Sequence, residues 1–180
     1  MPPEVPKVDI KTSDIVRRAD ELCRKYQTRD PFVLADSLGI TVLKRPFNAQ
    51  RGAYKIILKN RFIFLKDDMP EVMQRIVILH EIGHDVLHRN QAAAQGGFQE
   101  FKLFETNGSR LEYEANVFAA QVSLPDDEIL SYIEEGYDIQ QIAGIMHSDV
   151  NLVALKNDTL IARGYRFRPQ DHKNEFLKAD

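Results

Sequence analysis

One motif constrains this chain more than any other. Residues 72–88 contain His80, Glu81 and His84 in the spacing H-E-x-x-H. Residues four apart lie on one face of an α-helix, one turn apart, so a helix here lets both imidazoles bind one ion. Zinc lowers the pKa of a bound water to about 7, and a neighbouring glutamate can take the proton as that water attacks a carbonyl. The motif therefore predicts a metal site with His80 and His84 as ligands and Glu81 as the catalytic residue.

The residues around the motif favour a buried, capped helix. Apolar side chains recur three or four positions apart, and both histidines fall on this stripe. The stripe consists of Met73, Ile76, Val77, His80, His84 and Leu87. Asp67 and Asp68 can cap the helix, and Pro70 suits its first turn. Gly83 costs about 1 kcal/mol inside a helix, which indicates a close backbone approach beside the metal. The competing interpretation is an amphipathic helix whose histidines have this spacing by chance.

A catalytic zinc usually takes three protein ligands and a water. His88 follows His84 by four residues, but it is two turns from His80, about 12 Å along a straight helix. Zn–N bonds are about 2 Å long, so His80 and His88 cannot reach one ion unless the helix breaks. Nothing between His84 and His88 breaks it. We therefore predict that His88 forms a wall of the site or supports a ligand.

A second helix, over residues 110–124, offers a better third ligand. Glu112 shares a face with Ala115, Asn116 and Ala119, and such a small face lets this helix approach the first one closely. Asn116, one turn on, can hydrogen-bond a ligating group. Glu114 lies about 200° around the helix, where a solvated or salt-bridging role is expected. Glu112 is therefore the preferred third ligand, and Glu114 is the alternative.

Composition excludes several classes of protein. The chain has 180 residues, of which 43% are hydrophobic and 28% charged, as in an ordinary globular domain. Its net charge of −3 gives no reason to expect direct contact with nucleic acid. The N-terminal segment lacks the apolar region of a signal peptide, and no apolar stretch is long enough to span a bilayer. With the single cysteine, Cys23, predicted as a core residue, we expect a cytoplasmic protein without disulfides.

The order of predicted elements gives an α+β fold. Residues 1–11 read as a flexible arm, 12–125 as a peptidase-like domain, 126–165 as a helical subdomain packed on it, and 166–180 as a polar tail. The predicted strands are residues 40–45, 53–59 and 61–66, with a tight hairpin around Asn60. The predicted helices are residues 12–27, 31–38, 72–88, 110–124, 125–135, 139–146 and 150–163. The phenylalanine-rich residues 89–109 fit neither period and could form a flexible joint with an edge strand, a lid or a draped loop.

Three segments resemble the ImmA/IrrE family of zinc metallopeptidases. Residues 30–42 are similar to its opening helix and strand, and residues 61–88 to its strand and zinc helix. Residues 112–125 are similar to its signature E-x-E-A-N-x-F-A…L-x-P. The three predicted strands indicate a small sheet of about three strands. The resemblance implies a zincin-like fold, a Zn²⁺ cofactor, and a glutamate of the second helix as third ligand. Carried onto this sequence, the related gluzincin pattern gives Glu112, with Asn116 supporting a ligand.

The resemblance also implies a substrate. Members of this family cleave helix-turn-helix repressors of prophages, mobile elements and stress regulons, which relieves repression. We therefore expect an intracellular zinc endopeptidase whose partner is such a repressor. For the group that stabilises the oxyanion the sequence offers several candidates without a favourite. These are Tyr113, Tyr132, Tyr137 and His147.

Two other functions compete with hydrolysis. Residues 138–163 could form a helix-turn-helix that binds DNA, but Asp149 and Asp158 oppose Lys156 and Arg163 on its second helix, which disfavours phosphate contact. Alternatively, the protein binds metal and sequesters a regulator without cleaving it. A non-catalytic metal site needs no carboxylate at Glu81, so the motif favours hydrolysis.

Overall fold

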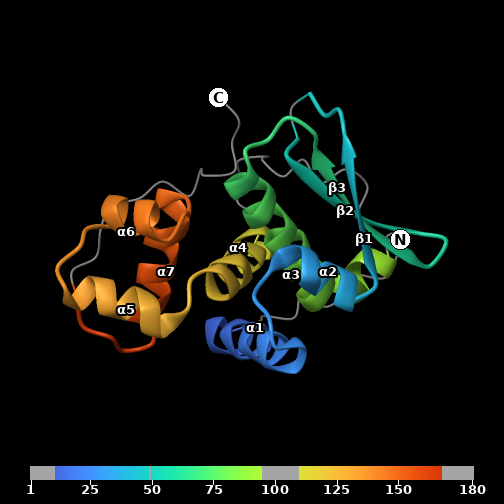
Figure 1. The fold of residues 1–180 in the computed structure, drawn as a ribbon. Helices are drawn as coiled ribbons and strands as arrows, with labels where there is room; N and C mark the ends of the chain where they lie inside the picture. The colour runs from blue at the N-terminus through green and yellow to red at the C-terminus, as the bar shows by residue number, and fades with distance from the viewer. Residues whose placement is uncertain (1–10, 49, 95–109, 168–180) are drawn as a thin grey trace.

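A computed structural model describes residues 11–48, 50–94 and 110–167 of the chain (Figure 1). These residues form the predicted α+β fold, a zincin-like domain with a three-stranded sheet and seven helices. In chain order the elements are α1 (Thr12–Tyr26), α2 (Pro31–Ser37), β1 (Ile40–Arg45), β2 (Gly52–Ile57), β3 (Asn60–Lys66), α3 (Glu71–Ala94), α4 (Arg110–Ser123), α5 (Asp126–Glu134), α6 (Ile139–Ile145) and α7 (Val150–Ala162). Within the described ranges, no helix is both long and apolar enough to cross a bilayer.

The sheet has the strand order β1-β3-β2, so β2 lies at one edge. Strand β1 pairs with β3 in parallel, and β2 pairs with β3 in antiparallel orientation. Helix α3 packs against β2 and β3, and α2 packs against β1 (Figure 1). This arrangement brings the edge strand β2 beside the helix that carries the H-E-x-x-H motif.

The β2–β3 turn differs from the sequence prediction. We expected it around Asn60, but Leu58 and Lys59 form the turn, and Asn60 begins β3. Both turn residues have positive φ angles, 50° and 65°. Two-residue hairpins favour such angles because their twist matches that of the strands. The Asn60 side chain donates a hydrogen bond to the Leu58 carbonyl at 3.2 Å, which supports the turn without a glycine.

The central layer consists of α3 and α4, which pack against each other (Figure 1). Helix α3 continues to Ala94, so residues 89–94 are helical rather than the start of the irregular segment that we expected. The run of three alanines carries the strongest helix propensity and extends the helix. The remainder of that segment, residues 95–109, lies outside the described residues, and the predicted lid is not tested.

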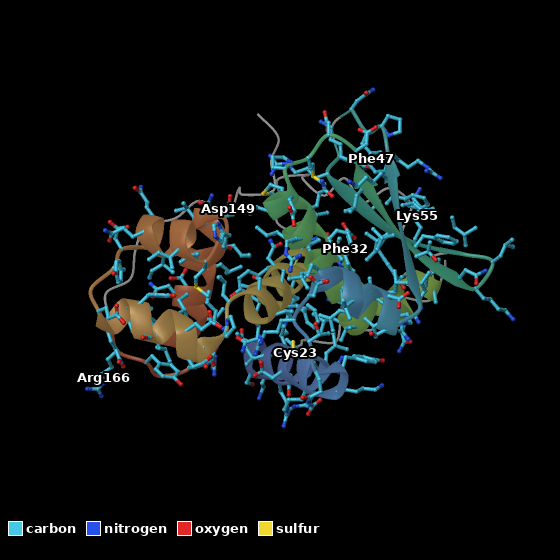
Figure 2. The ribbon with its side chains drawn as sticks, viewed as in Figure 1. Cys23, Phe32, Phe47, Lys55, Asp149 and Arg166 are labelled. Atoms are coloured by element: carbon cyan, nitrogen blue, oxygen red, sulfur yellow. The ribbon has the colours of Figure 1, made fainter. Side chains whose placement is uncertain are left out.

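Helix α1 packs against α4. Cys23 lies on the side of α1 that faces α4 (Figure 2) and is only 7% exposed. Burial also raises the pKa of its thiol. A buried thiol with a raised pKa is a poor nucleophile. The prediction of a core cysteine is confirmed.

The C-terminal helices begin and end where the sequence predicted. Asp138 and Gln141 form a reciprocal capping box at the start of α6. The Asp149 side chain accepts a hydrogen bond from the Asn151 backbone at 2.8 Å and caps α7. Gly164 follows α7 with a φ of +100°, a conformation that a glycine adopts without strain.

A buried charge network joins these helices to α4. Lys156 on α7 is fully buried, and its Nζ contacts the side chains of Gln121 on α4 and Asp126 on α5. Arg163 contacts the other carboxylate oxygen of Asp126 at 2.5 Å. Burial alone would raise the pKa of Asp126, but the two cations outweigh it and lower the pKa to about 2. Asp126 therefore neutralises a charge that has no access to water.

Replacing Asp126 with asparagine is expected to lower the free energy of unfolding by about 2 kcal/mol at pH 7, because the ammonium of Lys156 stays buried without its counter-ion. The folded-state pKa of Asp126 is depressed, so its contribution is present above its unfolded pKa and declines as the pH falls toward 2. Urea unfolding of both proteins from pH 7 downward measures this difference. Asp127→Asn, an exposed position in the same first turn, should change stability by less than about 0.5 kcal/mol. Equal effects of both variants would contradict the prediction.

Candidate metal centre

The three side chains predicted to hold a metal come together between α3 and α4. His80, His84 and Glu112 each offer one ligand atom, and these atoms lie within 4.8 Å of one another. The two histidine Nε2 atoms are 3.0 Å apart. The Glu112 carboxylate oxygens are 3.1 Å from Nε2 of His80 and 3.4 Å from Nε2 of His84. Two imidazole nitrogens and one carboxylate form a donor set that suits zinc and other divalent ions.

A close helix crossing makes this convergence possible. A Cβ atom added to Gly83 would lie 3.2 Å from both Cα and the carbonyl oxygen of Ala115, and 3.3 Å from Cβ of Phe118. These distances are tighter than ordinary van der Waals contacts, so a side chain at position 83 would require α4 to shift. The prediction that Gly83 admits a close backbone approach is therefore confirmed. Ala115 belongs to the face of small residues that was predicted for the second helix, and this face meets Gly83.

The charges of the site also fit a cation. Burial lowers the pKa of His80, but the hydrogen bond and charge of Glu112 outweigh it, so the net shift is upward. Burial raises the pKa of Glu112, but its contacts with His80 and His84 outweigh this and lower the pKa. The space between the imidazoles and the carboxylate thus favours a positive charge. His80 is oriented toward this space by Asn116, whose Oδ1 lies 2.7 Å from Nδ1 of His80, as the sequence predicted.

Glu81 lies beside the three candidate ligands and is not part of their cluster. Its carboxylate is 2% exposed, and Oε1 has no hydrogen-bond partner among the described residues. Burial raises the pKa of Glu81 to about 8, against the opposing effects of His80 and of a backbone hydrogen bond from Tyr54. A carboxylate with a pKa near neutrality can both accept and return a proton. A cation held by the neighbouring ligands would favour its ionised form.

The edge strand β2 is held against α3 by a network of hydrogen bonds to Asp85, which the sequence analysis did not identify. The Tyr54 hydroxyl donates a hydrogen bond to Asp85 at 2.5 Å, and Arg61 of β3 donates to the other oxygen of Asp85 at 2.8 Å. Asp85 follows His84 directly and is buried. The network depends on the register between β2 and β3, which could not be read from the sequence. It ties both strands to α3, the helix that carries the two candidate histidine ligands.

Gly52 of β2 packs tightly against α3. A Cβ at this position would lie 2.4 Å from Cγ1 of Val77 and 3.2 Å from Oε1 of Glu81. Gly52→Ala is therefore expected to displace β2 and to lower the free energy of unfolding by about 1–3 kcal/mol, measured by urea denaturation. Gly144→Ala is the matched control, because a Cβ in α6 meets nothing within 4 Å and should leave stability equal or raise it by up to about 1 kcal/mol. Equal stability of Gly52→Ala and wild type would rule out the close contact.

His88 and Glu114 lie next to the centre but not in it. His88 contacts Nδ1 of His84, the ring nitrogen that faces away from the ligand cluster, at 3.0 Å. The prediction of a supporting role for His88 agrees with this contact. Glu114 is buried, 2% exposed, and pairs with Arg110 at 2.7 Å and with His88 at 2.9 Å. The salt-bridging role expected for Glu114 is present, but a solvated one is not.

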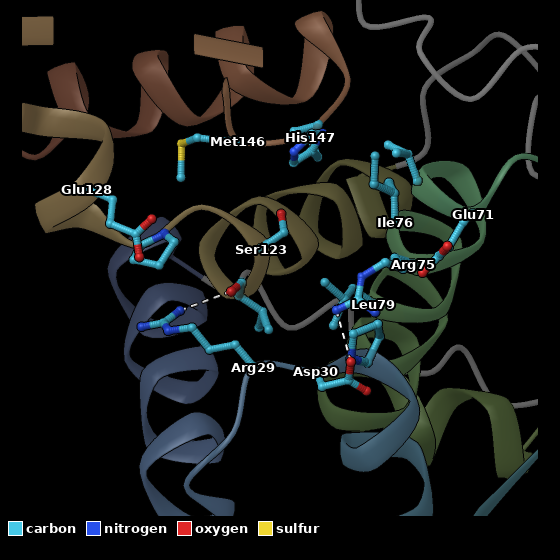
Figure 3. A pocket seen from close by; sticks show the side chains of 15 residues that line it. Arg29, Asp30, Glu71, Arg75, Ile76, Leu79, Ser123, Glu128, Met146 and His147 are labelled. Atoms are coloured by element: carbon cyan, nitrogen blue, oxygen red, sulfur yellow. Dashed lines mark hydrogen bonds and ion pairs between the residues drawn. The ribbon is translucent and has the colours of Figure 1, made fainter. Parts of the chain in front are cut away.

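In the part of the chain that the structure describes, the side chains considered for oxyanion stabilisation take no part in the contacts given above for His80, His84 and Glu112. Tyr132 and Tyr137 pack edge to face against each other, with ring centroids 5.9 Å apart, and Tyr113 is 43% exposed. His147 has a φ of 48° and lines a hollow of about 600 Å³ between α3, α4 and the C-terminal helices (Figure 3). None of the three metal-ligand candidates lines this hollow. The sequence candidates for this role therefore gain no support from the described residues.

Three charged residues of the same hollow, Arg29, Asp30 and Arg75, already have internal partners. Arg29 donates hydrogen bonds to the carbonyls of Gln121 and Val122 at 3.0 Å, and Arg75 pairs with Asp30 at 2.9 Å (Figure 3). These contacts hold the α1–α2 connection against α3 and the end of α4. We therefore assign the hollow to packing between the helices, and the candidate site is the cluster of His80, His84 and Glu112.

Comparison with known proteins agrees with this geometry. The sequence matches the family described as the IrrE N-terminal-like domain of peptidase M78 over residues 35–154, which include all the residues of the centre. The chain belongs to the ImmA/IrrE peptidase family. It is also 30% identical over 139 residues to the uncharacterized immunity region protein 2 of Bacillus phage phi105, a match that covers 76% of this chain and 84% of that protein. As an ImmA/IrrE member, the chain places the family's two signatures on α3 and α4, which cross at the centre.

Proposed function

We propose that this protein is a zinc-dependent endopeptidase that cleaves a helix-turn-helix repressor and so relieves repression. The observation that carries the proposal is the convergence of His80, His84 and Glu112, with the buried carboxylate of Glu81 beside them. Membership in a peptidase family supports the reaction class. The similarity to an immunity region protein of a phage supports a role in repressor regulation.

The proposed mechanism assigns a separate task to each side chain. His80, His84 and Glu112 would hold the zinc ion, which when bound acidifies water and polarises a carbonyl. Glu81 would take the proton from the attacking water at a carboxylate oxygen and return it to the nitrogen of the leaving amine. Its raised pKa suits both steps. Asn116 would keep His80 in the orientation that the ligand role needs.

The substrate would bind as an extended strand along the edge of β2. Strand β2 is an edge of the sheet, and its first residue, Gly52, lies against Glu81. Peptides commonly add to such an edge through main-chain hydrogen bonds. A peptide paired with β2 would run past the carboxylate of Glu81, so its scissile bond would lie over the metal centre. This binding mode requires an extended or locally unfolded segment of the repressor.

Burial of α7 argues against the DNA-binding alternative. Residues 152–157 of this would-be recognition helix are all buried, including Lys156 and Asn157. A recognition helix must expose its side chains to the major groove. Helix α7 instead packs against α4 and α6. We therefore assign it a structural role in the helical layer.

Incubation of the zinc-loaded protein with a purified helix-turn-helix repressor from the same mobile element or operon tests the proposal. We expect one specific cut, located by mass spectrometry of the fragments. Removal of zinc with a chelator should stop cleavage, and re-addition of zinc should restore it. No zinc binding, or tight repressor binding by the zinc-loaded protein without any cut, would refute the peptidase function.

A further inference from the structure

A chain of buried contacts leads away from the metal centre through His84. Its Nδ1 lies 3.0 Å from Nδ1 of His88, and Nε2 of His88 lies 2.9 Å from Oε2 of Glu114. The other oxygen of Glu114 accepts a hydrogen bond from Arg110 at 2.7 Å. His84, His88 and Glu114 are each no more than 2% exposed, so water does not compete for these contacts. We call His88 and Glu114 together the relay.

The relay fixes which nitrogen of His84 carries hydrogen. An ionised carboxylate only accepts hydrogen bonds, so Nε2 of His88 must donate to Glu114. A neutral imidazole carries hydrogen on one ring nitrogen only, so Nδ1 of His88 is then an acceptor. Nδ1 of His84 must then carry the hydrogen that lies between the two rings. The remaining nitrogen of His84, Nε2, then carries no hydrogen and faces the other ligand atoms.

The other histidine ligand is oriented in the same way by a single residue. Asn116 Oδ1 accepts from Nδ1 of His80 at 2.7 Å, which directs Nε2 of His80 to the centre. Asn116 and Glu114 both belong to α4, the helix that also carries Glu112. Helix α4 therefore supplies the proposed ligand Glu112, the direct acceptor for His80, and the carboxylate that accepts from His88. Glu114 affects His84 only indirectly, because His88 lies between the two side chains.

We infer that His88 and Glu114 are positioning residues, which hold His84 in the tautomer that presents Nε2 to the metal. This inference rests on the proposed function and adds a supporting pair that neither touches the metal nor contacts the substrate. A carboxylate that orients a ligating histidine is a common arrangement in metal sites, and its removal usually weakens metal binding. In this protein the carboxylate of Glu114 orients His84 through a second histidine, His88, one turn further along α3.

Variants of His88 separate this role from simple packing. His88→Leu fills a similar volume but offers no acceptor, whereas His88→Asn places an oxygen where Nδ1 of His88 was. We expect zinc affinity, measured by competition with a chromophoric chelator, to fall about 10–100-fold in His88→Leu and clearly less in His88→Asn. Long-range ¹H–¹⁵N spectra of the zinc-free proteins should show hydrogen on Nδ1 of His84 in wild type and His88→Asn, and its loss from that nitrogen in His88→Leu.

Two further variants control for folding. Ile129→Ala removes a fully buried side chain of α5 and should lower stability without changing zinc affinity. Glu114→Met removes the last acceptor and leaves both histidines in place, so it replaces His88→Leu if that variant fails to fold. Its zinc affinity should fall by the same order.

The outcomes distinguish this inference from the proposed function. Unchanged zinc affinity and an unchanged His84 tautomer in His88→Leu, with normal zinc binding by wild type, would overturn the relay alone. Failure of wild type to bind zinc would overturn the proposed function, and the spectra of the zinc-free proteins would still decide whether the relay sets the tautomer.

Discussion

Replacing Glu112 with alanine is expected to remove bound zinc, lowering zinc affinity by well over 100-fold, since loss of a supporting residue alone costs about 10–100-fold. Glu112 supplies the only carboxylate of the proposed ligand set, within 3.1 and 3.4 Å of the two histidine nitrogens. Its loss leaves two neutral nitrogens, which do not neutralise the charge of the ion. Elemental analysis of protein purified without a metal-affinity tag measures the zinc content directly, with about one ion per chain expected for wild type.

Glu114→Ala is the matched control for Glu112→Ala, because the two glutamates lie two residues apart on α4. Through the relay, Glu114→Ala should weaken zinc binding but retain the ion when zinc is in excess. Glu112→Ala should bind little zinc even then. If zinc were lost with Glu114→Ala and retained with Glu112→Ala, the third ligand would move to Glu114 and the proposed role of Glu112 would be wrong.

Local features of the centre were predictable because they depend on positions along one helix. The spacing of His80 and His84 fixes their common face for any α-helix. The close approach of α4 to α3 was predictable from the size of the residues, because Gly83 on α3 and Ala115 on α4 leave space for a close crossing. The assignments of His80, Glu81, His84 and Glu112 as functional residues stay predictions, although the structure brings all four together.

Features that depend on long-range geometry were not predictable. The contact between His88 and Glu114 depends on the crossing of α3 and α4 and on the reach of a long side chain. The parallel pairing of β1 with β3 places a strand between β1 and β2, although β1 and β2 are consecutive in sequence. Patterns of hydrophobic residues specify which face of a strand is buried, but not which strand is its neighbour.

The division between the peptidase-like residues 12–125 and the helical residues 126–165 stays a prediction. Lys156 of the second part is buried against Gln121 of the first, and both contact Asp126 at the boundary. A buried charge shared in this way opposes independent movement of the two parts, because separation would break its pairing. The helical layer is thereby attached to α4, the helix that carries Glu112.

Glu81→Gln is expected to lower the rate of repressor cleavage by about 10²–10⁴-fold while zinc content stays at the wild-type level. Glutamine keeps the shape of the side chain but cannot accept a proton at the operating pH. Glu81 is not among the three clustered ligand atoms, so the metal site itself should survive. Single-turnover cleavage, with enzyme in excess over repressor, measures the chemical step without product release.

The same variant separates hydrolysis from sequestration. Glu71→Gln, at the exposed start of α3, changes the same residue type on the same helix and should leave cleavage unchanged. A protein that acts by cleavage needs the proton acceptor, so Glu81→Gln should bind the repressor yet fail to relieve repression in cells. If Glu81→Gln relieved repression as well as wild type, the protein would act by holding its partner. The buried carboxylate beside the metal ligands would then need another explanation.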